Sequence, residues 1–226
     1  LFDYGTLTAE TLGAIVAGDF TNVALTPPAD SPYSDLINMT TSKVIDNGTG
    51  KVQLVIDGTD AAIWDGSTGT DWATAGNWVD SIAPSTTVAA VVDSSAGSTP
   101  LLSGAADANT LIIDGASATI ATGGALTVAN NTHVMDGSTL TVIGSLASTG
   151  DTTVYDGGLL DVTGTLTLTG NLNSAGTTTF GGPASALAGA GVLNVTAGTT
   201  TLGSDTTVGI GGLNAIGGVL NLEADL

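Results

Sequence analysis

Three aspartates at nearly equal spacing are the residues of this chain whose types could do chemistry together. Asp114, Asp136 and Asp156 each follow an apolar run and precede a glycine, and they are 22 and 20 residues apart. Clustered carboxylate oxygens bind Ca²⁺, so a column of them would form a calcium ladder. An Asp-Gly pair is also ordinary turn chemistry, because the carboxylate accepts bonds from nearby backbone and glycine adopts positive φ. The nonapeptide repeat of calcium-binding β-rolls is absent, so we favour turns and keep calcium as the alternative.

Groups that could carry catalysis are sparse. His133 is the only histidine, and no Ser/Asp constellation accompanies it in the sequence. Asp156 and Asp161 could form the carboxylate pair of a glycosidase, but Asp161 lies between two apolar residues, where a strand would turn it to solvent. A polysaccharide lyase commonly uses Lys or Arg, and no Lys or Arg occurs from Val52 onward. We therefore predict no enzyme activity, no catalytic residues and no cofactor beyond possible calcium.

The three tryptophans lie in one short stretch that a proline closes: Trp64-Asp65-Gly66, Trp72, Asn77-Trp78 and Pro84. One interpretation is a cap, in which the rings plug one end of an elongated core. The other is a carbohydrate platform, because exposed tryptophan faces stack on sugars. We favour the cap and keep carbohydrate binding by Trp64, Trp72 and Trp78 as the alternative.

The charge balance excludes several classes of partner. The chain has 226 residues, of which 2 are basic and 21 acidic, and its formal net charge is −19. Binding to nucleic acid or to an anionic membrane surface needs Lys and Arg, so we expect neither a nucleic-acid partner nor membrane insertion. There is no cysteine, which excludes disulfides and thiolate metal sites. An acidic composition rich in Thr and Gly is associated with extracellular proteins.

The elements that would position these residues repeat about every twenty residues. Three copies between Asp107 and Leu168 each contain an apolar strand ending in Asp-Gly and two further short strands; the first strands are residues 111–115, 133–137 and 153–157. The chain contains 33 glycines and only 4 % aromatic residues, which favours short strands joined by tight turns. We predict an all-β fold, a parallel β-helix (β-solenoid) of about 20–22 residues per coil.

The repeat array extends over residues 86–226, which corresponds to about six to seven coils and a height of about 30 Å. Residues 87–93 are an earlier coil, residues 178–181 and 200–203 continue the pattern, and residues 192–195 and 219–222 echo each other. Only the two ends of such a stack have unpaired strand edges. The tryptophan segment would cover the first end. The last strand-like run, residues 218–222, predicts either continuation in a longer chain or pairing with another subunit.

The start of the chain differs from the repeats. Residues 8–17 predict a short helix, and residues 42–56 predict a hairpin about Asn47-Gly48. The predicted organisation is a small mixed N-terminal region (residues 1–60), a Trp-rich cap or linker (61–85) and β-solenoid repeats (86–226).

A strand pair followed by W-D-G…W…N-W…P and then by Gly- and Thr-rich repeats resembles autotransporter passenger domains and related bacterial surface proteins. The resemblance covers residues 42–226 and is most specific between Trp64 and Pro84. In that family this segment precedes a right-handed parallel β-helix, so the resemblance implies that handedness and a location outside the cell. The chain differs from the family in lacking its usual Gly-Gly-Thr runs.

These observations predict a non-enzymatic extracellular structural or adhesive β-solenoid, either a segment of a cell-surface protein or a subunit of a surface assembly or filament. Its partners would be other protein subunits that meet at the solenoid ends, or surface glycans. The alternative is a carbohydrate-binding or carbohydrate-cleaving β-helix similar to phage tailspikes. The N-glycan acceptor pattern occurs at Asn38, Asn47, Asn130 and Asn194.

Overall fold

The computed structural model describes residues 32–36, 43–46, 52–55 and 60–223, and the chain divides into two compact units, residues 1–60 and 61–226. In the first unit the described elements are the 3-10 helix η1 (Pro32–Leu36) and the strands β1 (Lys43–Asp46) and β2 (Val52–Val55). β1 and β2 are antiparallel, with Lys43 opposite Val55, which confirms the predicted hairpin. The helix predicted for residues 8–17 lies outside the described residues.

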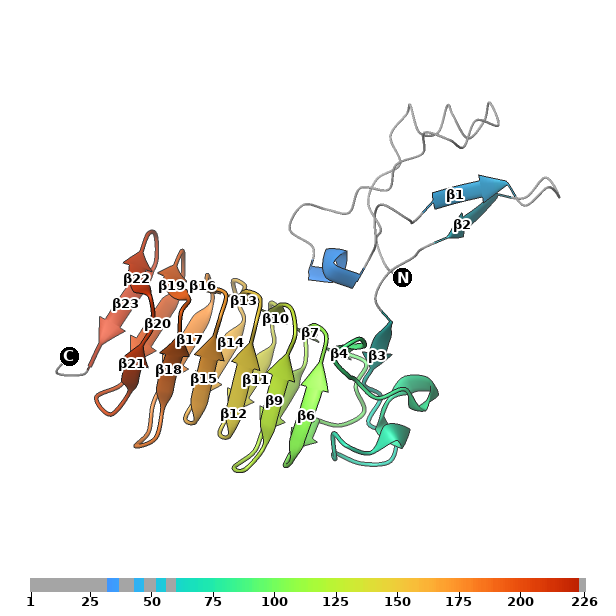
Figure 1. The fold of residues 1–226 in the computed structure, drawn as a ribbon, viewed down its shortest axis with the longest axis horizontal. Helices are drawn as coiled ribbons and strands as arrows, with labels where there is room; N and C mark the ends of the chain where they lie inside the picture. Colours follow the sequence, from blue (N-terminus) through green and yellow to red (C-terminus); the bar gives the residue numbers. More distant parts are fainter. Residues whose placement is uncertain (1–31, 37–42, 47–51, 56–59, 224–226) are drawn as a thin grey trace. The chain divides into compact units, whose positions relative to one another are not determined.

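The second unit is a parallel β-solenoid (Figure 1). Each coil contributes one strand to each of three sheets, so each strand pairs with the strand three places further along the chain. Six complete coils begin at β4, β7, β10, β13, β16 and β19, and β22 and β23 belong to a seventh. In Figure 1 the coils follow one another in sequence order from green to red. The β-solenoid predicted from the repeat is confirmed.

The strands sort into the three sheets as follows. The first sheet contains β3 (Ala61–Ile63), β4 (Ala89–Asp93), β7 (Leu111–Asp114), β10 (Thr132–Val134), β13 (Thr152–Val154), β16 (Leu172–Ser174), β19 (Val192–Val195) and β22 (Gly212–Ala215). The second contains β5 (Leu101–Leu102), β8 (Ser117–Ile120), β11 (Thr139–Val142), β14 (Leu159–Val162), β17 (Thr177–Phe180), β20 (Thr199–Leu202) and β23 (Val219–Leu222). The third contains β6 (Ala105–Ala108), β9 (Ala125–Val128), β12 (Ser145–Ser148), β15 (Thr165–Leu168), β18 (Ala186–Gly189) and β21 (Thr207–Gly209).

Helical structure in the second unit is limited to η2 (Ala75–Asn77) and η3 (Val79–Ser81). These are single 3-10 turns between β3 and β4. In the part of the chain that the structure describes, no helix has the length and apolar character needed to cross a membrane.

Alternation along each strand decides which side chains form the core. In β11, Leu140 and Val142 are buried, whereas Thr139 and Thr141 lie between them on the outer side. Leu140 is in register with Leu160 of the next coil, so buried residues stack along the axis. The stacked residues form one hydrophobic cluster that extends from the tryptophans to the sixth coil. Burying each Leu or Val is worth about 1.5–3 kcal/mol, so core stabilisation is distributed along the whole solenoid.

The strand registers confirm the predicted coil length. Between β4 and β23 the offset from one coil to the next lies between 18 and 22 residues. Asp93 lies opposite Asp114, as the earlier coil at residues 87–93 predicts. The echo between residues 192–195 and 219–222 is not a coil repeat, because β19 pairs with β22 and β23 pairs with β20. The two segments belong to different sheets.

A glycine column forms the corner between the second and third sheets. Gly104, Gly124, Gly144 and Gly164 occupy it in successive coils. The residue after each glycine donates its N–H to the glycine one coil before, as Thr165 does to the Gly144 oxygen at 2.9 Å. A Cβ added to Gly144 or Gly164 would overlap the backbone oxygen of the preceding glycine, whereas one added to Gly104 would meet nothing within 4 Å. Glycine is therefore required here by the close approach of two backbones.

Polar side chains fix the register at the corner between the third and first sheets. The side-chain oxygens of Asn131, Asp151 and Asn171 each accept a backbone N–H from the following coil. Their donors are the N–H groups of Asp151 at 2.8 Å, Asn171 at 2.8 Å and Val192 at 3.1 Å. Because each acceptor reaches only its own position one coil on, this ladder aligns the coils at a place where the backbone leaves the sheets.

Candidate functional site

The tryptophan segment (residues 64–84) lies across the first end of the solenoid. Trp64 follows β3, the first strand of the first sheet, and its N–H donates to the Val91 oxygen at 2.8 Å. The Trp72 N–H donates to the Leu101 oxygen at 3.1 Å, which places this part of the segment beside β5, the first strand of the second sheet. The segment therefore pairs with the otherwise unpaired edges of two sheets.

The three tryptophan rings form one nested cluster. The Trp78 ring meets Trp64 and Trp72 edge to face, with ring centroids 5.0 and 4.8 Å apart. Both ring nitrogens that lie deepest are satisfied: Trp64 Nε1 donates to the Ser98 oxygen at 2.6 Å, and Trp78 Nε1 donates to the Trp72 oxygen at 2.9 Å. All three rings are at most 5 % exposed and belong to the solenoid core. This is the arrangement that the cap interpretation predicts.

The carbohydrate platform would need exposed ring faces, and the burial of Trp64, Trp72 and Trp78 removes them. The sequence analysis also missed the role of Asn77. Its side chain is buried, Oδ1 accepts the Thr68 N–H at 2.9 Å, and Nδ2 donates to the Asp71 oxygen at 2.9 Å. Asn77 thus ties two loops of the cap together, and its place directly before Trp78 was the signal that could have revealed it.

The aspartates of the Asp-Gly series do not form one column. The register of β7 with β10 places Met135 beside Asp114, because Val134 lies opposite Ile113 and the Met135 N–H donates to the Ile113 oxygen at 2.9 Å. Asp136 is therefore one residue beyond the position of Asp114. Asp136 and Asp156 are again aligned, because β10 and β13 are offset by 20 residues. The additional residue lies between Asp114 and Asp136.

Turn chemistry accounts for the corner positions. The Asp93 carboxylate accepts the Ser95 N–H at 2.8 Å, the bond expected of an aspartate that begins a turn. Gly115, Gly137 and Gly157, which follow the three predicted aspartates, have φ of 63°, 67° and 77°. Among the described residues, no three acidic or histidine side chains come together as metal ligands would. Calcium binding at Asp114, Asp136 and Asp156 stays a prediction, for which calorimetry with Ca²⁺ is the test.

His133 and the acidic pair considered for catalysis occupy ordinary strand and corner positions. His133 lies in β10 and is 7 % exposed, and its Nδ1 is 3.3 Å from the Tyr155 hydroxyl. Asp161 is in β14, between Thr141 and Thr179 of the neighbouring coils. Asp156 begins the corner that precedes β14. What this arrangement offers chemically is hydrogen bonding along the sheets.

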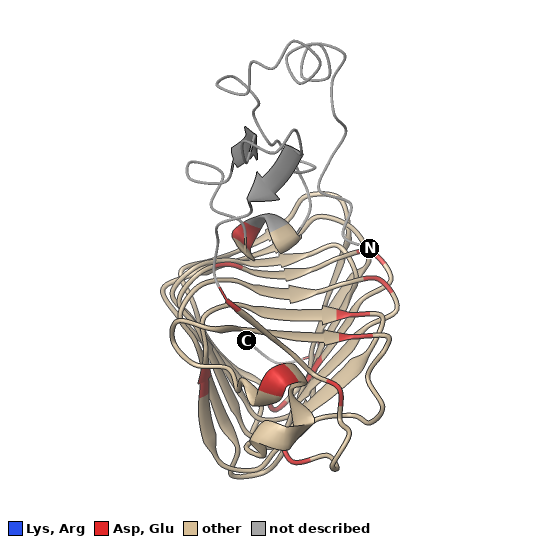
Figure 2. Ribbon diagram, turned by 90° about the vertical axis from the view of Figure 1, so that its right-hand side faces the viewer, with Lys and Arg blue, Asp and Glu red and all other residues tan. Residues whose placement is uncertain are grey.

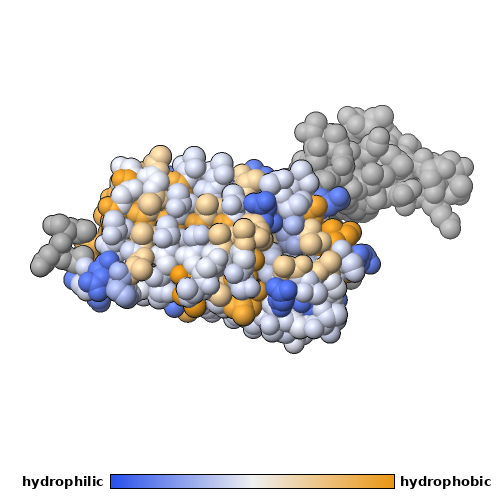
Figure 3. Space-filling model, turned by 60° about the horizontal axis from the view of Figure 1, so that its bottom comes forward, coloured by the Kyte–Doolittle hydropathy of each residue, from blue (hydrophilic) through white to orange (hydrophobic). Residues whose placement is uncertain are grey.

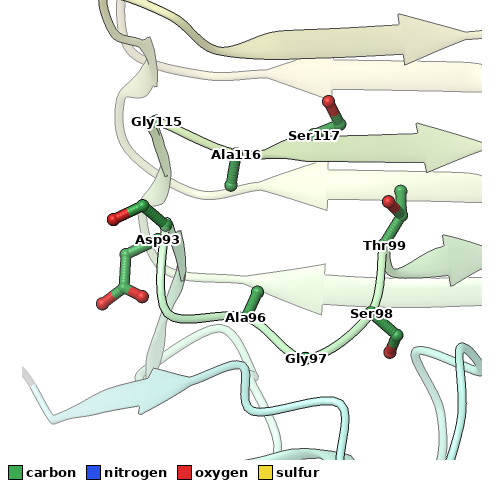
Figure 4. Close-up of a pocket in the computed structure, with 9 residues that line it drawn as sticks. Asp93, Ala96, Gly97, Ser98, Thr99, Gly115, Ala116 and Ser117 are labelled. Atoms are coloured by element: carbon green, nitrogen blue, oxygen red, sulfur yellow. The ribbon is translucent and has the colours of Figure 1, made fainter.

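A polar hollow of about 290 Å³ lies beside the first coils (Figure 4). Its lining is rich in hydroxyl groups and contains one carboxylate: Asp93, Ser94, Ala96, Gly97, Ser98, Thr99, Gly115, Ala116 and Ser117. Residues 94–100, which join β4 to β5, form one side of it; the corresponding corner in the next coil has only residues 115–116. The sequence analysis missed this hollow, because the spacing from Asp93 to Asp114 is regular whether or not the corner is long.

The last strand of each sheet forms the second end of the solenoid. We call β21, β22 and β23 the terminal strands. No strand of the described chain pairs with their outer edges. Leu213 and Leu222 are in register with the fully buried Leu193 and Leu202, yet they are 36 % and 46 % exposed. Core positions are thus uncovered at this end, as the strand-like run at residues 218–222 predicted.

The remaining solenoid surface is weakly polar and uniformly acidic in its charges. On the face seen in Figure 3 most residues are pale, neither strongly hydrophilic nor strongly hydrophobic. Every charged residue from 60 to 223 is acidic, and Figure 2 shows these residues spread over several corners and strands. Such a surface favours cations and neutral polar ligands over anionic ones.

The fold and its cap define a class: parallel β-solenoids whose first end is closed by a tryptophan segment. The family model described as a domain of unknown function (DUF8693) matches residues 63–182, more than half of the chain, and the chain belongs to this family. The match begins in β3, includes the tryptophan segment and ends after β17. No curated protein and no solved structure matches the chain.

Proposed function

We propose that the chain is a non-enzymatic structural or adhesive β-solenoid of the cell surface, either a segment of a surface protein or a subunit of a surface assembly. The observation that carries this proposal is the continuity of the solenoid. Three hydrogen-bonded sheets and one hydrophobic cluster run from the cap through the sixth coil.

Such a structure supports a mechanical role. Each coil is hydrogen-bonded to the next on all three sides, and its buried side chains stack on those of its neighbours. Separating two coils would break these bonds and expose both layers of the core together. A spacer or support needs this resistance, and a repeat array can reach any length by adding coils.

Composition and resemblance support the surface location. The surface carries only acidic charges between residues 60 and 223, which favours solubility and repulsion between molecules. The segment from Trp64 to Pro84 resembles autotransporter passenger domains, which lie outside the cell. Both observations agree with an extracellular solenoid whose partners are other subunits or surface glycans.

Antibody labelling of intact cells tests the proposed location. Antibodies raised against the purified chain are applied to intact and to permeabilised cells of the source organism. We expect intact cells to be labelled and brief protease treatment of intact cells to remove the signal. Labelling only after permeabilisation would contradict the surface proposal. An antibody against a cytoplasmic protein serves as the control for cell integrity.

The polar hollow favours a second function, binding of a neutral carbohydrate. Its volume of about 290 Å³ is sufficient for a single sugar residue, and hydroxyl groups and the Asp93 carboxylate can hydrogen-bond sugar hydroxyls. Ala96 and Ala116 pack against the core and supply an apolar part of the lining.

A glycan array followed by titration tests this second function. We expect a neutral glycan to bind and Asp93→Asn to weaken binding at least tenfold, because the amide loses the charge-assisted acceptor but can still accept the Ser95 N–H. Asp107→Asn, at an exposed position of β6, is the matched control. No binding on the array, or equal loss in both variants, would rule out this site.

A further inference from the structure

The terminal strands present an end that is complementary to a copy of itself. In each of them one edge pairs with the preceding coil, and the other edge has no neighbour among the described residues. Leu213, Val219 and Leu222 are exposed there by 36 %, 54 % and 46 %. An edge that combines free backbone N–H and C=O groups with exposed core side chains is a template for strand addition.

Charge makes this end the region where two copies can meet most easily. The chain carries a net charge of −19, so most surfaces of two molecules repel each other. From Thr206 to Leu222 there is no charged residue at all. The uncharged segment includes all three terminal strands, and it is bounded by Asp205 and Glu223. Two such ends can approach without placing carboxylates against one another within the contact.

An amide ladder ends at the same place. Asn194 Nδ2 donates to Asn173 Oδ1 at 2.9 Å, and Asn214 Nδ2 donates to Asn194 Oδ1 at 3.0 Å. The ladder runs in one direction, so each new member offers its own Oδ1 to the following coil. Asn214 is exposed in β22, and its Oδ1 is positioned to accept from an added strand. The outer side of the first sheet therefore continues the same preference for a further layer.

The cap decides which end of a second copy can occupy this site. The first end of the solenoid is covered by the tryptophan segment, which pairs with the first and second sheets and buries Trp64, Trp72 and Trp78. Head-to-tail stacking would require this cap to be displaced. A tail-to-tail contact needs no displacement, because two identical open ends related by a two-fold axis oppose strands in antiparallel directions.

We propose that two copies of the chain associate tail to tail through β21, β22 and β23. This inference rests on the proposed structural function and names the partner, a second copy, and the direction of assembly. The contact is one coil wide and smaller than a standard interface, so we expect a micromolar dissociation constant. Main-chain hydrogen bonds would supply specificity, and Leu213 and Leu222 would pack against their counterparts.

Light scattering and analytical ultracentrifugation of the 226-residue chain over a wide concentration range test the proposal. We expect conversion from a species of 21.9 kDa to one of twice that mass. Leu213→Asp and Leu222→Asp each place a carboxylate in the contact and should weaken dimerisation at least tenfold. Ile82→Asp, which alters a side chain of the cap segment that is 47 % exposed, adds the same charge away from the contact and should leave dimerisation unchanged. Circular dichroism checks that each variant remains folded.

Several outcomes would overturn the tail-to-tail contact. A single species of 21.9 kDa at every concentration would do so. Equal weakening by Ile82→Asp would show general charge repulsion instead of a local contact, and filaments would show that the capped end also participates. Hydrogen exchange adds a positional readout: dimer formation should slow exchange in β22 and β23, and slowing in the cap alone would contradict the proposal. Because this assay uses purified protein, it can fail while surface labelling succeeds, and the reverse also holds.

Discussion

Two threonine hydroxyls are buried in the core without a hydrogen-bond partner. Thr152 Oγ1 and Thr200 Oγ1 are the buried side-chain polar atoms of the described residues that lack one. Thr178, which is in register with Thr200, is also fully buried, but its hydroxyl lies 3.0 Å from the Ser174 hydroxyl. A buried polar group without a partner keeps its desolvation cost, so the same residue type contributes differently at neighbouring positions.

Replacing these threonines by valine should therefore change stability in opposite directions. Thr200→Val and Thr152→Val remove an unsatisfied hydroxyl at nearly constant shape and should each stabilise the fold by about 1 kcal/mol. Thr178→Val leaves the buried Ser174 hydroxyl without this partner and should destabilise it by about 1–2 kcal/mol. Urea denaturation of the three variants measures the free energies of unfolding. The explanation fails if Thr178→Val is as stable as Thr200→Val.

The tryptophan cap also allows a prediction at a single residue. Trp78 meets both other rings and is 1 % exposed, so Trp78→Ala should cost about 3–5 kcal/mol of unfolding free energy. Ile82 belongs to the same segment but is 47 % exposed, and Ile82→Ala should change stability by less than about 0.5 kcal/mol. Thermal denaturation followed by near-UV circular dichroism distinguishes them. Similar losses for both variants would show that the rings do not hold the cap.

At the scale of elements, strand alternation was predictable and corners were less so. Leu140 and Leu160 lie inside as their place between threonines or other outward residues predicts, because side chains of a strand alternate between its two faces. The alignment of Asp114 with Asp136 was not predictable from spacing. A spacing of 22 residues fits a coil, yet one of those residues is absorbed at the corner between them. Spacing gives the total length of a coil and leaves open where an additional residue lies.

The glycine column provides the test at this scale. Gly144→Ala and Gly164→Ala would force a methyl group against the backbone oxygen of the preceding coil, and each should destabilise the solenoid by about 1–3 kcal/mol. Gly104→Ala belongs to the same column, but no coil lies before it at this corner, so this variant should be neutral or slightly more stable. Differential scanning calorimetry gives the comparison. A destabilisation by Gly104→Ala equal to the others would point to helix or turn preference instead of backbone contact.

At the scale of the whole molecule, a stack of coils should be stable in its middle and weaker at its open end. The coil of β13, β14 and β15 has a neighbour on both sides, whereas the terminal strands have one. Local opening is easiest where few contacts must be broken. Hydrogen exchange on monomeric protein should therefore show the strongest amide protection in the central coils, lower protection in β22 and β23, and substantial protection beside the cap. Uniform protection would indicate one cooperative unit without fraying.

The sequence by itself determined the solenoid, its period of about twenty residues and the glycine and aspartate corners. These features follow from local rules: alternation fixes which side chains face inward, and positive φ requires Gly115, Gly137 and Gly157. It also indicated the cap, because three tryptophans in one segment need to be covered. Only the tertiary structure decided which aspartates align, that all three rings are buried, and that a hollow lies beside residues 94–100. These depend on how corner lengths add up from coil to coil and on which surfaces then meet, and neither quantity is a property of any single segment.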